Sequence, residues 1–129
     1  MWKKDALGVQ FTGSLPSEIQ GMSNIEVLQL DHARFDRGST RLPDELYSLT
    51  NLKSLRLSNS NFSGTISTLI GNLSELKVLD LSGNNLIGTI PSEIGLLSNL
   101  ETLKLDSNPM TQFLPTEITQ LTSLVNFEP

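Results

Sequence analysis

The feature that most constrains the fold of this chain is an internal repeat with a period of 24 residues. Across the whole repeat, the apolar spacing matches neither a helix nor a single strand. A fixed period of roughly 20 to 29 residues is instead typical of a solenoid, in which each coil buries its apolar side only against neighbouring coils. One copy comprises Leu76, Leu79, Leu81, Asn84, Leu86, Gly88, Ile90, Pro91, Ile94 and Leu97.

The repeat predicts a single solenoid domain over residues 1–129. A partial coil covers 1–24 and a truncated coil covers 124–129. The coil 25–51 is longer than the others because an insertion follows Phe35. The full coils are 25–51, 52–75, 76–99 and 100–123.

Each coil is predicted to contain a short strand and a buried turn. Leu79 and Leu81 are two residues apart, which places both on one face of a strand, so that successive coils form a parallel sheet. The amide of Asn84 can pair with backbone groups inside the stack. Ser60 takes the same position one coil earlier, where Asn59 or Asn61 would compensate for it. Ala33 cannot pair in this way, so we expect its coil to be the least regular.

A short helical turn is predicted in the second half of each coil, on the convex side. Gly13, Gly64 and Gly88 precede it where the chain bends and positive φ is needed. Proline and an acidic residue then suit a helix start, as in "IPSEI". The same preference accounts for the column Glu18, Glu45, Glu93 and Glu117 better than a cation site does.

These motifs resemble the leucine-rich repeat family, specifically its plant-type repeats, which also occur in algal and diatom proteins. The resemblance rests on L-x-x-L-x-L-x-x-N-x-L and on second halves such as "GTIPSEIGLL", and it covers residues 9–127. It implies a right-handed α/β solenoid with a parallel sheet on the concave face and short helical turns on the convex face. It also favours an extracellular or receptor-ectodomain location, although the segment contains no signal peptide.

Composition excludes several classes of function. The net charge of -5 and only nine Lys and Arg residues argue against a nucleic-acid partner. The absence of cysteine excludes disulfides and thiolate metal sites. We expect no metal, no cofactor and no membrane insertion by this segment, because no apolar run approaches the roughly 18 residues of a membrane span. His32 is the one imidazole, which does not suffice for an enzyme active site.

The candidate partner-binding residues are the polar side chains that face outward from the predicted strands. Arg56, Asp80 and Lys104 take the same position in adjacent coils, so we expect them to pair laterally. No aromatic anchor is present on this face, which predicts a polar footprint. The full candidate set is Gln29, Asp31, His32, Arg56, Ser58, Asp80, Ser82, Lys104 and Asp106.

The insertion "RFDRGSTR" brings together Arg34, Arg37 and Arg41. Three arginines can grip a carboxylate or a phosphate, and inserted loops on rigid scaffolds often carry function. A solvated loop without a function is the alternative. Two N-glycosylation sequons begin at Asn61 and Asn72, a number that this composition also gives by chance.

The predicted function is non-enzymatic recognition of a protein or peptide ligand, as the resemblance implies. The alternative is a surface-binding protein that meets ice or a polysaccharide, which needs a repeated rank of identical small polar residues. The mixed column of Gln29, Arg56, Asp80 and Lys104 argues against that alternative. Self-association through the open C-terminal coil, where Leu124 and Phe127 lack a following repeat, is also expected.

Overall fold

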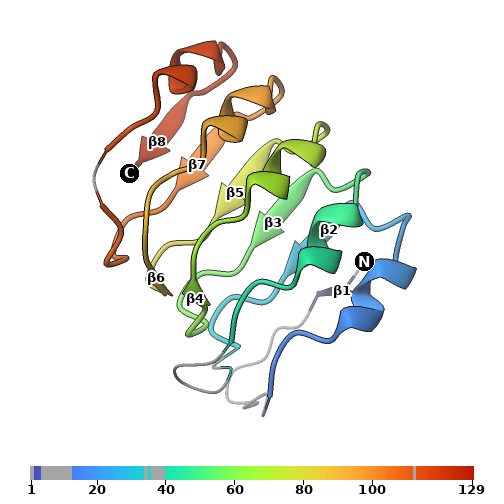
Figure 1. Ribbon diagram of the computed structural model, residues 1–129. Coiled ribbons are helices and arrows are strands. Elements are labelled where there is room, and N and C mark those ends of the chain that lie inside the picture. Colours follow the sequence, from blue (N-terminus) through green and yellow to red (C-terminus); the bar gives the residue numbers. More distant parts are fainter. Residues whose placement is uncertain (1, 4–12, 34, 36–39, 112) are drawn as a thin grey trace.

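A computed structural model of the chain describes residues 2–3, 13–33, 35, 40–111 and 113–129. In this part of the chain, strands and short 3-10 helices alternate, and the coils stack side by side (Figure 1). The strands lie along one side of the stack and the helices along the other, as the repeat predicts.

The strands form a parallel six-stranded sheet in the order β1-β2-β3-β5-β7-β8. Its register aligns the same repeat position in successive coils: Leu28 pairs with Leu55, Leu55 with Leu79, Leu79 with Leu103, and Leu103 with Phe127. The sheet comprises β1 (Trp2–Lys3), β2 (Val27–Gln29), β3 (Ser54–Arg56), β5 (Val78–Asp80), β7 (Thr102–Lys104) and β8 (Asn126–Glu128).

The helical turns are 3-10 helices of five residues, one per coil. Four of the five have proline at the N-cap and an acidic side chain in the first turn, which confirms the helix-start interpretation of the glutamate column. The exception is η3, where the Ser67 side chain caps the helix by accepting from the Leu69 N–H at 3.2 Å. The helices are η1 (Ser17–Gly21), η2 (Asp44–Ser48), η3 (Thr68–Asn72), η4 (Ser92–Leu96) and η5 (Thr116–Gln120).

A second, two-stranded sheet joins β4 (Ser63–Gly64) to β6 (Asn85–Leu86), and the sequence analysis did not anticipate it. It forms where the chain leaves the main sheet, next to Gly64 and Gly88. These two glycines have φ of 82° and 79°, as predicted for this bend. The second sheet therefore holds the coils together on the flank between strands and helices.

The core is a continuous column of leucines with larger side chains near the insertion. Phe35 and Phe62 pack with ring centroids 5.0 Å apart, and Tyr47 is fully buried in the same core cluster. The buried turn is also filled as expected at Asn84, whose side chain is buried and hydrogen-bonded. The apolar stack and this amide together fix the coil spacing, and with it the spacing of the side chains on the sheet.

Ser60 differs in part from the expectation, because its own hydroxyl bonds to the neighbouring backbone. The Ser60 hydroxyl itself donates to the Leu30 carbonyl at 2.7 Å and accepts from the Ala33 N–H at 3.2 Å. Asn61 helps by donating to the Phe35 carbonyl, whereas Asn59 makes no such bond. Ser60 therefore continues the series of buried polar side chains that bond one coil to the next, because its short side chain still reaches both neighbouring backbones. Residues 34 and 36–39, which follow Ala33, lie outside the described residues, so the regularity of this coil stays a prediction.

Candidate binding face on the parallel sheet

One row of side chains crosses the exposed face of the main sheet from strand to strand. The register places Gln29 beside Arg56, Arg56 beside Asp80, Asp80 beside Lys104, and Lys104 beside Glu128. Each follows a core leucine or phenylalanine in its strand, so the alternation of a strand turns it toward solvent. We call these five residues the concave row. The sequence analysis found all of them except Glu128.

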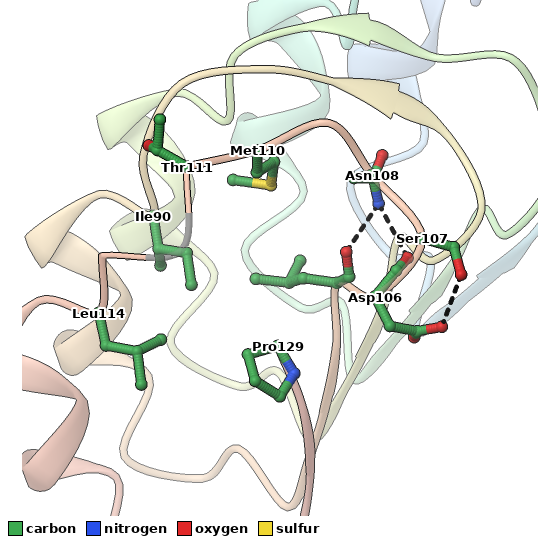
Figure 2. Close-up of a pocket in the computed structure, with 9 residues that line it drawn as sticks. Ile90, Asp106, Ser107, Asn108, Met110, Thr111, Leu114 and Pro129 are labelled. Carbon is green, nitrogen blue, oxygen red and sulfur yellow. Dashed lines mark hydrogen bonds between the residues drawn. The ribbon is translucent and has the colours of Figure 1, made fainter.

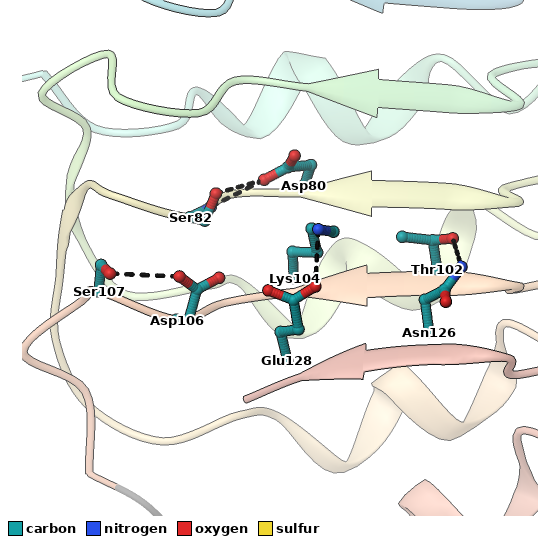
Figure 3. Close-up of polar contacts among 8 residues, drawn as sticks. All are labelled: Asp80, Ser82, Thr102, Lys104, Asp106, Ser107, Asn126 and Glu128. Atoms are coloured by element: carbon teal, nitrogen blue, oxygen red, sulfur yellow. Dashed lines mark hydrogen bonds and ion pairs between the residues drawn. The ribbon is translucent and has the colours of Figure 1, made fainter.

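The expected lateral pairing of Arg56, Asp80 and Lys104 is wrong in its charge contacts. The three residues are neighbours in register, but the ion pair in this row joins Lys104 Nζ to Glu128 at 2.7 Å (Figure 3). That carboxylate raises the pKa of Lys104 by its hydrogen bond and its charge. Asp80 instead accepts two bonds from Ser82, at 2.7 Å from the hydroxyl and 3.1 Å from the N–H. Ser82 lies only two residues after Asp80, so this bond forms within one coil without ordering a long side chain on a neighbouring strand.

Arg56 consequently has no ion pair or hydrogen bond from its side chain among the described residues. It is exposed at the middle of the sheet, on β3, with two strands on one side and three on the other. A guanidinium in this setting offers five donors to a ligand without first breaking an internal contact.

A second column lies just beyond the strand ends, and hydrogen bonds join two of its members, Asp31 and Ser58. Asp31 accepts from the N–H and the hydroxyl of Ser58, both at 2.9 Å, and from the Gln29 amide at 3.0 Å. Ser82 takes the same position in the next coil, and Asp106 in the coil after that. These candidates are half-buried and fixed in orientation, which suits a recognition surface of defined shape.

His32 lies where the chain turns after β2, and its role there is conformational. It has φ of 58°, and the equivalent Asn59, Gly83 and Ser107 have φ of 53°, 66° and 58°. The position therefore requires a left-handed backbone, which Gly, Asn and His adopt more readily than most residues. The exposed imidazole makes no hydrogen bond or ion pair with any described residue.

The arginine cluster of the insertion is described only at Arg41. Arg41 pairs with Ser63 in an isolated parallel bridge, and its side chain lies over Gly64. Arg34 and Arg37 lie outside the described residues, so the structure does not test whether the three arginines come together. The binding of a carboxylate or phosphate by this loop stays a prediction.

A pocket of about 300 Å³ opens beside the last strands and was not found from the sequence (Figure 2). One carboxylate oxygen of Asp106 is buried there without a hydrogen-bond partner. The other oxygen accepts from the Ser107 hydroxyl at 3.2 Å. Apolar and polar side chains line the pocket in about equal measure, with walls from Ile90, Leu105, Met110, Leu114, Thr111, Asn108, Ser107 and Pro129.

The residues that precede the strands form two ion pairs that the sequence analysis missed. Lys53 contacts Glu26 at 2.8 Å, and Lys77 contacts Glu101 at 3.6 Å. The bond to Glu26 raises the pKa of Lys53. The signal was present in the sequence, because these four residues share one repeat position in adjacent coils. Their exposure limits what such pairs add to stability.

The described residues contain no group of three His, Asp or Glu side chains placed to hold a metal ion. Nor does this part of the chain contain a helix with the length and apolarity needed to cross a membrane.

Comparison with known proteins supports the repeat. The model of the leucine-rich repeat family matches residues 50–110. A search of curated proteins found no match. The chain is therefore a leucine-rich repeat protein, as its stacked coils and registered leucines indicate.

Several solved structures are similar to this chain over most of its length. The ectodomain of the Arabidopsis thaliana receptor kinase GASSHO1/SCHENGEN3, in complex with CASPARIAN STRIP INTEGRITY FACTOR 2, has a TM-score of 0.84 and 36% identity over 89% of this chain and 13% of that one. The Arabidopsis receptor kinase HAESA, in complex with the peptide hormone IDA and the co-receptor SERK1, has a TM-score of 0.84 and 33% identity over 92% of this chain and 20% of that one.

A plant ice-binding protein is also similar, with a TM-score of 0.77 and 30% identity over 92% of this chain and 38% of that one. The chain thus spans a small part of the length of these relatives. It belongs to the plant-type leucine-rich repeat family.

Proposed function

We propose that residues 1–129 act as a non-enzymatic module that recognises an extended peptide across the concave row. The observation that carries this proposal is the unpaired Arg56 at the centre of the registered row Gln29, Arg56, Asp80, Lys104 and Glu128. The two similar receptor kinases were solved with a peptide hormone or an integrity factor bound, which supports the same class of ligand here.

The charges of the row suggest the chemistry of that ligand. Neighbouring strands are about 4.8 Å apart, so a peptide that crosses them can place successive side chains on successive members of the row. Arg56 is free to take an acidic side chain, while Lys104 is already satisfied by Glu128. The second carboxylate oxygen of Asp80 makes no hydrogen bond with any described residue, so it can accept from a basic or hydroxyl group. The preferred ligand therefore carries an acidic residue beside a basic or hydroxylated one.

A selection of random displayed peptides on the immobilised chain tests the proposal. Peptides that enrich are synthesised and titrated calorimetrically against the parent chain, Arg56→Gln and Lys77→Gln. Lys77→Gln is the matched control, because it removes the same charge from an exposed residue outside the row. We expect the Arg56 variant to bind roughly tenfold more weakly or worse, as for loss of a charge-assisted hydrogen bond. Equal affinities for all three chains, or no enrichment, would reject the proposal.

A surface-binding function is a second candidate, favoured by one flank of the solenoid. The concave row is mixed, but the position four residues before each main-sheet strand from β2 to β8 carries a hydroxyl, and all these residues are exposed. Asn51 and Asn99 hold adjacent coils in register there by donating to the Ser23 and Ser74 carbonyls, each at 2.9 Å. The rank consists of Ser23, Thr50, Ser74, Ser98 and Thr122.

This rank has the regularity that an ice surface would need, and one similar structure is an ice-binding protein. Thermal hysteresis of the purified chain is the measurement. If the candidate holds, the parent chain shows hysteresis, which Ser98→Lys abolishes and Thr68→Lys, on the helical side, preserves. A parent chain without hysteresis rejects this candidate and leaves the peptide proposal untouched.

We also propose self-association through the last coil. That coil leaves Phe113, Leu114 and Val125 exposed at 78%, 44% and 80%. β8 is the edge of the described sheet, with unpaired backbone groups that can accept another strand. Sedimentation equilibrium at several concentrations tests this. We expect a dimer that Val125→Lys dissociates, and a monomer at every concentration would contradict the proposal.

A further inference from the structure

The two N-glycosylation sequons lie in very different surroundings. Such a sequon needs an Asn side chain that can leave the protein surface carrying a large, hydrated sugar. We infer that Asn72 is an acceptor site for an N-linked glycan, and that Asn61 is not one in the folded protein. This inference concerns the convex side and is independent of the proposed peptide binding.

Asn72 is the last residue of η3 and is exposed. The middle residue of its sequon, Leu73, is fully buried, while Asn72 and Ser74 on either side are exposed. The buried leucine therefore anchors the tripeptide and turns both reactive side chains outward. Neither the Asn72 amide nor the Ser74 hydroxyl makes a hydrogen bond with a described residue. A sugar on the Asn72 nitrogen would break no existing contact.

Asn61 is held by the fold at the very atom that would carry the sugar. Its side-chain nitrogen donates to the Phe35 carbonyl at 2.9 Å, and the residue is half-buried with φ of 64°. The next residue, Phe62, is fully buried against Phe35. Ser63 lies in β4, where its N–H donates to the Thr40 carbonyl. A glycan at Asn61 would have to displace this packing, so it would compete with folding.

The position of Asn72 also suits a bulky group on the convex side. The equivalent residues in the flanking coils are Ser48 and Leu96, both exposed. Leu96 is 61% exposed and its side chain reaches back toward Gly71, next to Asn72. The first sugar of a glycan would therefore lie over an apolar side chain that the protein leaves open to water. The glycan would extend from the helices, on the side of the coil opposite the sheet.

The test is secretion of the full chain from a glycosylating eukaryotic host behind a cleavable signal. Peptide-N-glycosidase treatment in H₂¹⁸O converts each glycosylated Asn to labelled Asp, and mass spectrometry of the proteolysed chain then locates it. We expect label at Asn72 in most molecules and none at Asn61. An unlabelled Asn72, or label at Asn61 in folded material, would overturn the inference.

Three variants provide the controls. Asn72→Gln and Ser74→Ala each remove the sequon from exposed positions, and both should abolish the mass shift of the intact protein. Asn61→Gln should leave that shift unchanged. If the shift survives in Asn72→Gln, the acceptor is another residue and the inference fails. Peptide selection on enzymatically deglycosylated chain keeps this result separate from the proposed function.

Discussion

The side-chain oxygen of Asn84 accepts a hydrogen bond from the backbone N–H of Ser60, one coil earlier, at 3.0 Å. The same oxygen accepts from the Phe62 N–H, and the Asn84 amide nitrogen donates to the Leu57 and Leu81 carbonyls. The amide nitrogen also donates to the Ser82 carbonyl at 3.2 Å, so one buried side chain bonds to five backbone groups in two coils. The buried polar side chains therefore link neighbouring coils in addition to the leucines.

Replacement of Asn84 by alanine should therefore be strongly destabilising. It leaves buried backbone groups of two coils without partners, at about 1 to 3 kcal/mol for each unsatisfied group. We expect a loss of about 3 kcal/mol or more in the free energy of unfolding, measured by urea denaturation. Asn85→Ala is the control, because Asn85 is exposed and its side chain makes no hydrogen bond with a described residue. Similar midpoints for the two variants would contradict this role of the buried amide.

Gly95 should not tolerate even a methyl group. A Cβ there would lie 2.7 Å from the Glu117 carbonyl oxygen, which is backbone and cannot rotate away. We expect Gly95→Ala to push η4 and η5 apart and to cost about 1 to 3 kcal/mol. Gly21→Ala, in η1, meets nothing within 4 Å and should be neutral or slightly stabilising. Thermal melts of both variants decide this, and equal melting temperatures would show that the close helix contact is not tight in solution.

Tyr47 should make the fold sensitive to alkaline pH. Burial, opposed by a weak bond from the Ser67 N–H and assisted by the charge of Asp44, raises the pKa of Tyr47 to about 12. Above pH 10 the unfolded chain loses this proton while the folded chain keeps it, so stability falls as the pH rises from 10 to 12. The loss is at most about 3 kcal/mol, and this contribution is constant below pH 10.

Two measurements follow from this expectation. Because Tyr47 is the only tyrosine, absorbance at 295 nm reports its ionisation alone, with a midpoint near the unfolding transition rather than near pH 10. The melting temperature of Tyr47→Phe should fall less steeply over the same pH range, since lysines titrate alike in both proteins. A tyrosine that ionises near pH 10 in the folded chain would disprove its burial.

The loss of stability on truncating a leucine to alanine should depend on how deeply that leucine is buried. Leu79 is fully buried at the centre of the sheet, so Leu79→Ala should cost about 2 to 5 kcal/mol through lost contacts and a cavity. Leu69 is 38% exposed on η3, so Leu69→Ala should cost far less. Urea midpoints with unchanged slopes would measure both, and comparable losses would refute the assignment of Leu69 to the surface.

The sequence by itself determined the stack of coils and which residues face the solvent. Successive side chains of a strand point to opposite faces of the sheet. A repeat that buries its leucines only against neighbouring coils therefore allows only one strand register. That is why the outward set from Gln29 to Lys104, the glycines at the bends and the glutamates at the helix starts could all be named in advance.

Only the tertiary structure decided how these side chains pair. Asp80 bonds to Ser82 rather than to Arg56, and Lys104 pairs with Glu128 rather than with Asp80. These contacts depend on atomic distances that a repeat pattern does not contain. The same holds for the hydroxyl of Ser60 in place of an amide, for the two-residue strands β4 and β6, and for the bond that occupies Asn61 while Asn72 stays free. Periodicity fixes which face a residue is on, whereas hydrogen bonds and charges act over a few ångströms between residues that lie one coil apart in the chain.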